Sequence, residues 1–190
     1  MNGISVGFAL CGSFCTFEKV LEQMRLLVAA GARVTPIMSE TAYSTDTRFG
    51  TAEHFKNEIE GICKNEIIHT ITAAEPIGPQ KILDVLLVEP CTGNTLAKLA
   101  NGITDTAVTM ACKSHLRNAR PLVLAVSTND ALGNSARNIG ALLNYKNIYF
   151  VPMRQDDHIN KPRSVVADFS QTQNTILSAM DGQQVQPIFR

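Results

Sequence analysis

A run of small and polar residues follows the apolar segment 82–89. Thr92, Asn94 and Thr95 offer hydrogen-bond donors and acceptors with little bulk, and Gly93 lies among them. Such a turn lets a flat ligand approach the backbone closely, because no large side chain stands in the way. The residue types therefore predict that this turn lines a cofactor or substrate site.

A glycine-serine turn ends the first apolar segment, 4–10. Gly12 and Ser13 precede a segment with helical spacing, and a helix N-terminus with a hydroxyl beside it can hold a phosphate group. The same residues also suit an ordinary helix cap, so both interpretations stay open. Phe14 stands where a P-loop carries its phosphate-binding lysine, and the G-x-G-x-x-G pattern is missing. The turn is therefore not typical of an NTPase or of a dinucleotide-binding domain.

Apolar and amphipathic segments alternate around these turns. Apolar runs predict strands at 4–10, 82–89, 121–128 and 148–153. Residues 33–38, RVTPIM, are expected to form the second strand, with Pro36 favouring a strand end. Helical spacing predicts helices at 16–30, around Phe55, Ile59 and Ile62, and at 94–102, 105–118, 134–145 and 170–181. We expect a polar loop at 41–50 and a turn rich in Pro and Gly at 74–80.

This alternation predicts one α/β domain over residues 1–190. The expected architecture is a Rossmann-like, doubly wound parallel sheet with helices on both faces. In such sheets, ligands bind beyond the carboxyl ends of the strands, which is where both polar turns lie.

Composition argues against several classes of partner. The 17 basic residues balance 17 acidic ones, whereas nucleic-acid binders usually carry a basic footprint. The chain has no Trp and only 6% aromatic residues, so it offers no platform for base stacking. No apolar run approaches the ~20 residues of a membrane span, and the first residues do not resemble a signal peptide. We therefore expect a cytoplasmic protein that binds neither nucleic acid nor membrane.

The cysteines indicate neither a disulfide framework nor a metal site. There are five, an odd number, and no C-x2-C pair occurs. Cys11 and Cys15 are expected to be reduced, small packing residues.

The segment 90–106, PCTGNTLAKLANGITDT, resembles a motif of the flavoprotein family that includes the FMN-dependent cysteine-type decarboxylases. That motif reads P-A-S-A-N-T-(I/L)-A-K-(I/L)-A-x-G-(I/L)-x-D. The resemblance covers about residues 4–153 and implies the fold of that family, bound FMN, and a homo-oligomer with flavin sites between protomers. The matching positions are Pro90, Asn94, Thr95, Ala97, Lys98, Ala100, Gly102 and Asp105. The implied cofactor-binding residues are Gly12, Ser13, Ser39, Thr92, Gly93, Asn94, Thr95 and Ser127.

One segment departs from the decarboxylase pattern. The decarboxylases carry P-A-M-N after the fourth strand, and their Asn binds the substrate carboxylate. Here residues 126–129 read V-S-T-N, so Asn129 matches while Pro and Met do not. His69 is the nearest candidate for the decarboxylases' base, but the insertion that follows it changes the spacing. Asn129 is therefore expected at a substrate carboxylate, and cysteine decarboxylation is disfavoured.

Further blocks resemble a narrower family, the B subunits of the dipicolinate synthases of spore-forming bacteria. This resemblance implies part of an oxidoreductase that acts during spore formation. With a companion A subunit, it would oxidise a dihydrodipicolinate precursor to pyridine-2,6-dicarboxylate, with NAD(P) as acceptor. The A subunit carries a dinucleotide-binding domain, which agrees with the missing G-x-G-x-x-G pattern here. Two alternatives stay open: an FMN-dependent decarboxylase, and a non-catalytic chain that stabilises the A subunit. The blocks are STDTRFG (44–50), AEPIGP (74–79), STNDALG (127–133), KNIYFVPMRQDD (146–157) and KPRSVVADF (161–169).

A small dicarboxylate substrate needs cationic partners, and Arg suits carboxylates because it binds them with two hydrogen bonds. Arg48 in the polar loop and Arg154 after the fifth strand are the candidates. Asp156 or its neighbour Asp157 could accept a ring proton as general base, and Asn129 joins Asp156 as a catalytic candidate. Each charge also has an ordinary structural interpretation, as a solvated loop residue or as part of a turn with internal ion pairs.

Overall fold

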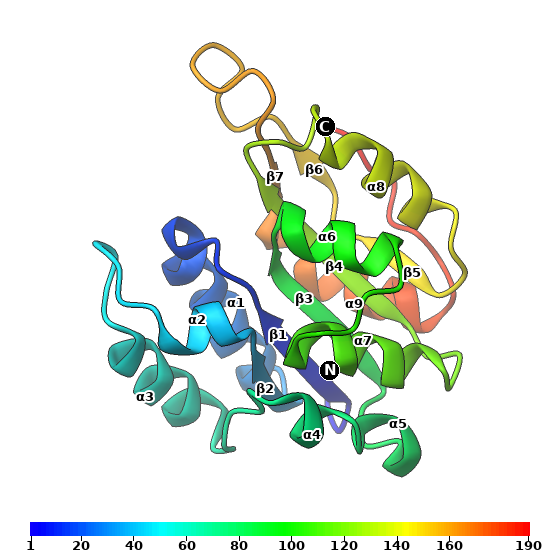
Figure 1. The fold of residues 1–190 in the computed structure, drawn as a ribbon. Coiled ribbons are helices and arrows are strands. Elements are labelled where there is room, and N and C mark those ends of the chain that lie inside the picture. The colour runs from blue at the N-terminus through cyan, green and yellow to red at the C-terminus, as the bar shows by residue number, and fades with distance from the viewer.

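The computed structural model describes residues 1–190 and contains one seven-stranded sheet flanked by helices (Figure 1). The strand order is β2-β1-β3-β4-β7-β6, and β5 pairs with β4 off this path. The strands are β1 (Ser5–Leu10), β2 (Arg33–Met38), β3 (Val85–Cys91), β4 (Leu122–Thr128), β5 (Ile148–Phe150), β6 (Met153–Arg154) and β7 (Val165–Ala167).

The first five strands form the predicted parallel sheet. Val6 in β1 pairs with Val34 on one side and with Val85 on the other, and Leu87 in β3 pairs with Val123 in β4. All residues of β3 are buried, as expected for a strand covered by helices on both faces. The carboxyl ends of β1 to β4 therefore meet at one edge of the sheet.

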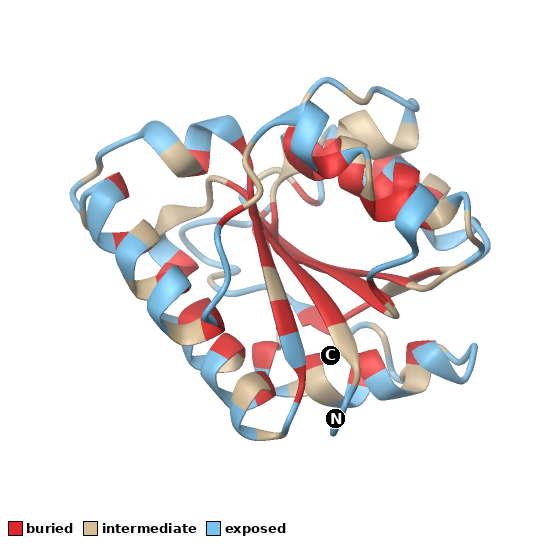
Figure 2. Ribbon diagram, turned by 90° about the horizontal axis from the view of Figure 1, so that it is seen from below, coloured by how far each residue is buried: buried red, intermediate tan, exposed pale blue.

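Helices cover both faces of this sheet, as the alternation of segments predicted. Figure 2 shows buried strands between two layers of helices whose outer surfaces are exposed. On one face, 25 buried residues join the sheet to α1, α3 and α9; on the other, 24 join it to α4 to α8. The helices are α1 (Phe17–Ala29), α2 (Glu40–Ser44), α3 (Ala52–Cys63), α4 (Ile71–Ala74), α5 (Ile77–Gln80), α6 (Gly93–Ala100), α7 (Ala107–Leu116), α8 (Ser135–Leu143) and α9 (Thr172–Met180), with short 3-10 turns η1 (Phe14–Thr16) and η2 (Phe169–Gln171).

The far edge of the sheet differs from the prediction. β7 runs antiparallel to β4 and to β6, so the sheet is mixed rather than purely parallel. The expected strand 148–153 is split, with β5 on β4 and β6 on β7. Pro152 lies at the break, where it has no N–H to donate to a ladder. β7 is only three residues long, which is too short for its apolar pattern to predict a strand.

Two segments expected to be irregular contain short helices. The loop 41–50 overlaps α2, whose N-cap Ser39 accepts a hydrogen bond from the Ala42 N–H. The turn 74–80 overlaps α4 and α5, and Thr70 caps α4 in the same way. Capping by Ser and Thr stabilises the first turn of a helix, and these caps are what the sequence prediction overlooked.

The thiols of all five cysteines are free. Cys11 is buried as predicted, but Cys15 is exposed on η1, so its expected packing role is wrong. None of the helices is both long and apolar enough to span a lipid bilayer.

Candidate functional site

The carboxyl ends of β1, β2 and β3 border a cavity of about 290 Å³. Most of its polar groups are hydroxyls, and we call it the hydroxyl cavity. It brings together five of the predicted cofactor-binding residues, contributed by three separate strand ends and the helices that follow them. The lining residues are Cys11, Gly12, Ser39, Glu40, Thr41, Thr92, Asn94, Thr95, Lys98 and Thr106.

The turn between β3 and α6 is held by its own threonines. Thr92 is the N-cap of α6: its Oγ1 accepts a hydrogen bond from the Thr95 N–H at 3.4 Å. The Thr95 hydroxyl donates to Sγ of Cys11 at 3.1 Å, which ties the turn to the end of β1. Burial raises the pKa of Cys11 to about 11, so this thiol stays neutral and is no nucleophile at neutral pH.

Both charged side chains of the hydroxyl cavity already have partners. Oε1 of Glu40 accepts a hydrogen bond from the Ala107 N–H, at the first turn of α7, where a carboxylate is favoured by the helix dipole. Nζ of Lys98 lies 2.8 Å from Asp105 and lowers the pKa of that carboxyl group. What the cavity offers a ligand is therefore a set of hydroxyl and N–H groups beside one ammonium group.

Ser13 and Ser127 lie next to this cavity but do not line it. Their Oγ atoms are 2.9 Å apart, so the turn after β1 and the end of β4 meet across the end of β3. Ser13 makes no side-chain capping bond to η1, so the capping interpretation of this serine does not describe the structure.

A second cavity of about 560 Å³ lies where the N-termini of α6 and α8 meet, and we call it the α6/α8 cavity. Thr92 and Asn94 line both cavities, so this one turn separates them. The close approach of the two helices requires Gly93. A Cβ atom there would lie 2.7 Å from Oγ of Ser135 and 2.9 Å from Oγ1 of Thr128. The lining residues are Thr92, Gly93, Asn94, Ala97, Thr128, Asp130, Asn134, Ser135, Arg137 and Asn138.

Sequence reasoning missed most of the α8 side of this cavity. Ser135 and Asn138 are buried, and Arg137 is exposed at its edge. Their helix has the polar composition of an ordinary surface helix, so these residues did not stand out as site candidates in the sequence. A usable signal was the polar pair Ser135 and Asn138, three residues apart and therefore on one helix face.

The predicted substrate residues lie outside both cavities in this chain. Arg48 lies over the ring of its neighbour Phe49, 4.9 Å from the ring centroid, in the loop after α2. Arg154 lines a separate cavity of about 320 Å³ beside α1 and β7. Asn129 is exposed, while the residues on either side of it, Thr128 and Asp130, line the α6/α8 cavity.

The predicted general base, Asp156, also lies outside both cavities. Asp156 is on the loop between β6 and β7, which projects from the molecule (Figure 1), and its carboxylate is 3.8 Å from Nζ of Lys161. Asp157 accepts hydrogen bonds from Asn160, which lower the pKa of its carboxyl group. Within one chain, the acid at the α6/α8 cavity is instead Asp130, whose Oδ1 accepts from the Asn134 N–H at 3.3 Å.

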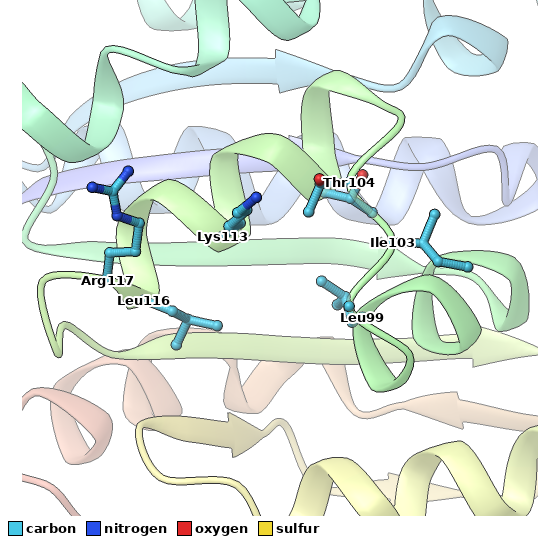
Figure 3. Close-up of a pocket in the computed structure, with 8 residues that line it drawn as sticks. Leu99, Ile103, Thr104, Lys113, Leu116 and Arg117 are labelled. Carbon is cyan, nitrogen blue, oxygen red and sulfur yellow. The ribbon is translucent and has the colours of Figure 1, made fainter.

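A further cavity of about 410 Å³ lies at the opposite end of α6, against α7 (Figure 3). Leu99, Ile103 and Leu116 give it an apolar lining, and Lys113 on α7 and Arg117 directly after this helix lie beside them. None of the predicted site residues lines it, and it contains neither a carboxylate nor a histidine. We therefore place the candidate site at the two cavities around Thr92 and Asn94.

Comparison with known proteins identifies the family of the chain. The B subunit of dipicolinate synthase from Bacillus subtilis is 45% identical over 188 residues, which cover 99% of this chain and 94% of that protein. The crystal structure of the corresponding B subunit from Bacillus halodurans, also 45% identical, superposes with a TM-score of 0.92 over 100% of this chain and 98% of that one. A crystal structure of an FMN-dependent cysteine decarboxylase shares the fold at 21% identity, with a TM-score of 0.69 over 93% and 97% of the two chains. The family model described as Flavoprotein matches residues 1–174, and the chain therefore belongs to the flavoprotein family.

Proposed function

We propose that this chain is the B subunit of a dipicolinate synthase and acts with an A subunit. The reaction is the oxidation of a dihydrodipicolinate precursor to the aromatic pyridine-2,6-dicarboxylate during spore formation. The observation that carries the proposal is the 45% identity to a dipicolinate synthase B subunit across 99% of the chain. Aromatisation of the ring releases a hydride equivalent and a proton, so the complex needs a hydride acceptor and a proton acceptor.

The hydroxyl cavity suits the phosphate end of FMN. Its donors are the hydroxyls of Ser39, Thr41 and Thr106 and the ammonium group of Lys98. The one carboxylate, Glu40, accepts a hydrogen bond from the Ala107 N–H at the start of α7, where the helix dipole offsets part of its negative charge. Bound FMN would supply a hydride acceptor next to the substrate.

We assign the dinucleotide to the A subunit. This chain has no G-x-G-x-x-G turn to hold a pyrophosphate. Glu40, the acid after β2 that could have contacted a ribose, is bonded to the Ala107 N–H instead. NAD(P) would therefore reach the reaction through the partner protein. We further propose that copies of this chain associate, as do those of the dodecameric FMN-dependent UbiX-like decarboxylase from Escherichia coli, which shares the fold.

The substrate ring is proposed to lie in the α6/α8 cavity. Thr92 and Asn94 line both cavities, so they can contact the cofactor on one side and the substrate on the other. Asp130 is the carboxylate at this cavity, and we propose it, in place of Asp156, as the acceptor of the ring proton. Its Oδ1 accepts from the Asn134 N–H, which fixes the carboxylate toward one side.

The test is a reconstitution with the two purified proteins. A visible absorption spectrum of the isolated chain should show bound flavin. The chain, the A subunit, or both would then be mixed with the precursor and NAD or NADP, and pyridine absorbance followed. We expect turnover only with both proteins present. Turnover by this chain alone would overturn the division of labour, and full turnover by the isolated A subunit would make this chain a non-catalytic, stabilising component. Release of CO2 without a partner would instead support a decarboxylase.

A further inference from the structure

The α6/α8 cavity contains an arginine that has no partner within the chain. Arg137 lies on the first turn of α8, its side chain is exposed, and it forms no ion pair. We propose that Arg137 binds a carboxylate group of the ring substrate at the point where the N-termini of α6 and α8 meet. This inference rests on the proposed function and names the group that recognises the dicarboxylate.

Two buried polar side chains beside Arg137 also lack partners. Ser135 is 4% exposed and Asn138 is 7% exposed, both line the cavity, and neither side chain makes a hydrogen bond within the chain. Their polar atoms still reach solvent, since Oε1 of Glu89 is the one fully enclosed side-chain polar atom without a partner, so both groups are available to a polar ligand in this cavity. A carboxylate can accept from both at once.

The backbone of α6 adds further donors. The N–H groups of Gly93 and Asn94 begin the helix and have no acceptor in the chain, because the hydroxyl of the cap Thr92 accepts from the Thr95 N–H and its carbonyl from the Leu96 N–H. Gly93 has no side chain to cover them, and the hydroxyls of Ser135 and Thr128 lie close to it. Free N–H groups at a helix N-terminus favour an anion.

The acidic residue that lines the same cavity leaves the guanidinium group of Arg137 available. Asp130 forms no ion pair with Arg137, and its Oδ1 is occupied by the Asn134 N–H. The guanidinium group therefore remains free to make a bidentate contact with a carboxylate. A ring held this way by one carboxylate lies in the same cavity as the proposed proton acceptor.

The experiment compares Arg137→Ala and Arg137→Lys with wild type in the complex with the A subunit. Arg117→Ala is the matched control, because Arg117 is also an exposed, unpaired arginine but lines the separate cavity at the other end of α6 (Figure 3). We expect Arg137→Ala to raise KM for the precursor ~10- to 100-fold, as loss of hydrogen bonds to a charged group predicts. Arg137→Lys should recover part of the loss, while FMN affinity and the thermal midpoint stay unchanged.

Binding of the product and of an analogue tests the contacted group directly. Titration of wild-type complex with pyridine-2,6-dicarboxylate and with pyridine-2-carboxylate should show tighter binding of the dicarboxylate. Arg137→Ala should shrink this preference at least several-fold, because one carboxylate loses its cationic partner.

The outcomes separate the two proposals. Wild-type complex that neither forms nor binds the dicarboxylate would overturn the proposed function, and this inference with it. A wild-type complex that works, with KM unchanged in Arg137→Ala, would overturn this inference alone. A loss of FMN affinity in Arg137→Ala, with substrate binding intact, would overturn it as well, because Arg137 would then bind the phosphate of the cofactor.

Discussion

The Thr172 hydroxyl donates a hydrogen bond of 2.6 Å to Oε2 of Glu89, and it joins α9 to β3 in the interior of the protein. Both side chains are fully buried, and Oε1 of Glu89 has no partner. Burial raises the pKa of Glu89 from its ordinary 4.5 to about 8. The carboxyl group is therefore neutral in the folded protein at neutral pH.

This elevated pKa predicts how stability depends on pH. In the unfolded chain Glu89 ionises near 4.5, and in the folded chain only near 8. The stability associated with its protonated form is complete below pH 4.5 and is lost as pH rises to 8, by up to ~1.4 kcal/mol per pH unit. Glu89→Gln, which cannot ionise, should therefore gain stability relative to wild type as pH rises. Urea unfolding at pH 5 and pH 8 measures this, with Glu18→Gln on the exposed face of α1 as control. Parallel pH profiles for wild type and Glu89→Gln would contradict it.

A second prediction concerns the contact of α6 with the end of β4 and the start of α8. Gly93→Ala would place Cβ within 3 Å of the Ser135 and Thr128 hydroxyls, so either the helix or these side chains must move. We expect a loss of about 1–3 kcal/mol in unfolding free energy and weaker FMN binding. Gly140→Ala in α8 is the control: its Cβ meets nothing within 4 Å, and alanine is the better helix former, so it should stabilise slightly. Equal stabilities of the two variants would show that the contact is not tight.

Most of the main sheet was predictable, because β1, β3 and β4 are almost entirely buried and their sequences are nearly continuous apolar runs. β3 illustrates this, since all its residues are buried. β6 and β7 were not, because two or three residues carry no period, and only the pairing of β7 with β4 and of β6 with β7 makes them strands. The turn at Thr92 was predictable from its motif, whereas Arg137 was not. Its place in the site depends on the packing of α8 against α6, which a local pattern does not contain.

The third prediction tests the turn shared by both cavities. Asn94 lines both and its side chain forms no hydrogen bond within the chain, so Asn94→Leu should leave the unfolding free energy nearly unchanged. Asn94→Leu should weaken FMN binding by roughly 1–3 kcal/mol, because polar groups of the ligand lose the Asn94 amide as a hydrogen-bond partner. Quenching of FMN fluorescence gives the affinity. Asn101→Leu, which alters an exposed Asn at the other end of the same helix, should leave FMN affinity as in wild type. Equal FMN affinities for Asn94→Leu and wild type would place the cofactor elsewhere.

The last prediction distinguishes two candidate proton acceptors. Asp130→Asn keeps an oxygen that can accept from the Asn134 N–H but removes the basic group from the α6/α8 cavity. In the complex with the A subunit, kcat for pyridine-2,6-dicarboxylate formation should fall ~10²- to 10⁴-fold, as is typical for loss of a general base. Asp156→Asn should change kcat little, because Asp156 is ion-paired with Lys161 on the loop between β6 and β7, outside both cavities. The reverse result would have a definite structural meaning. A large loss in Asp156→Asn with none in Asp130→Asn would require that loop to reach the site of a neighbouring protomer, because within its own chain Asp156 lines neither cavity.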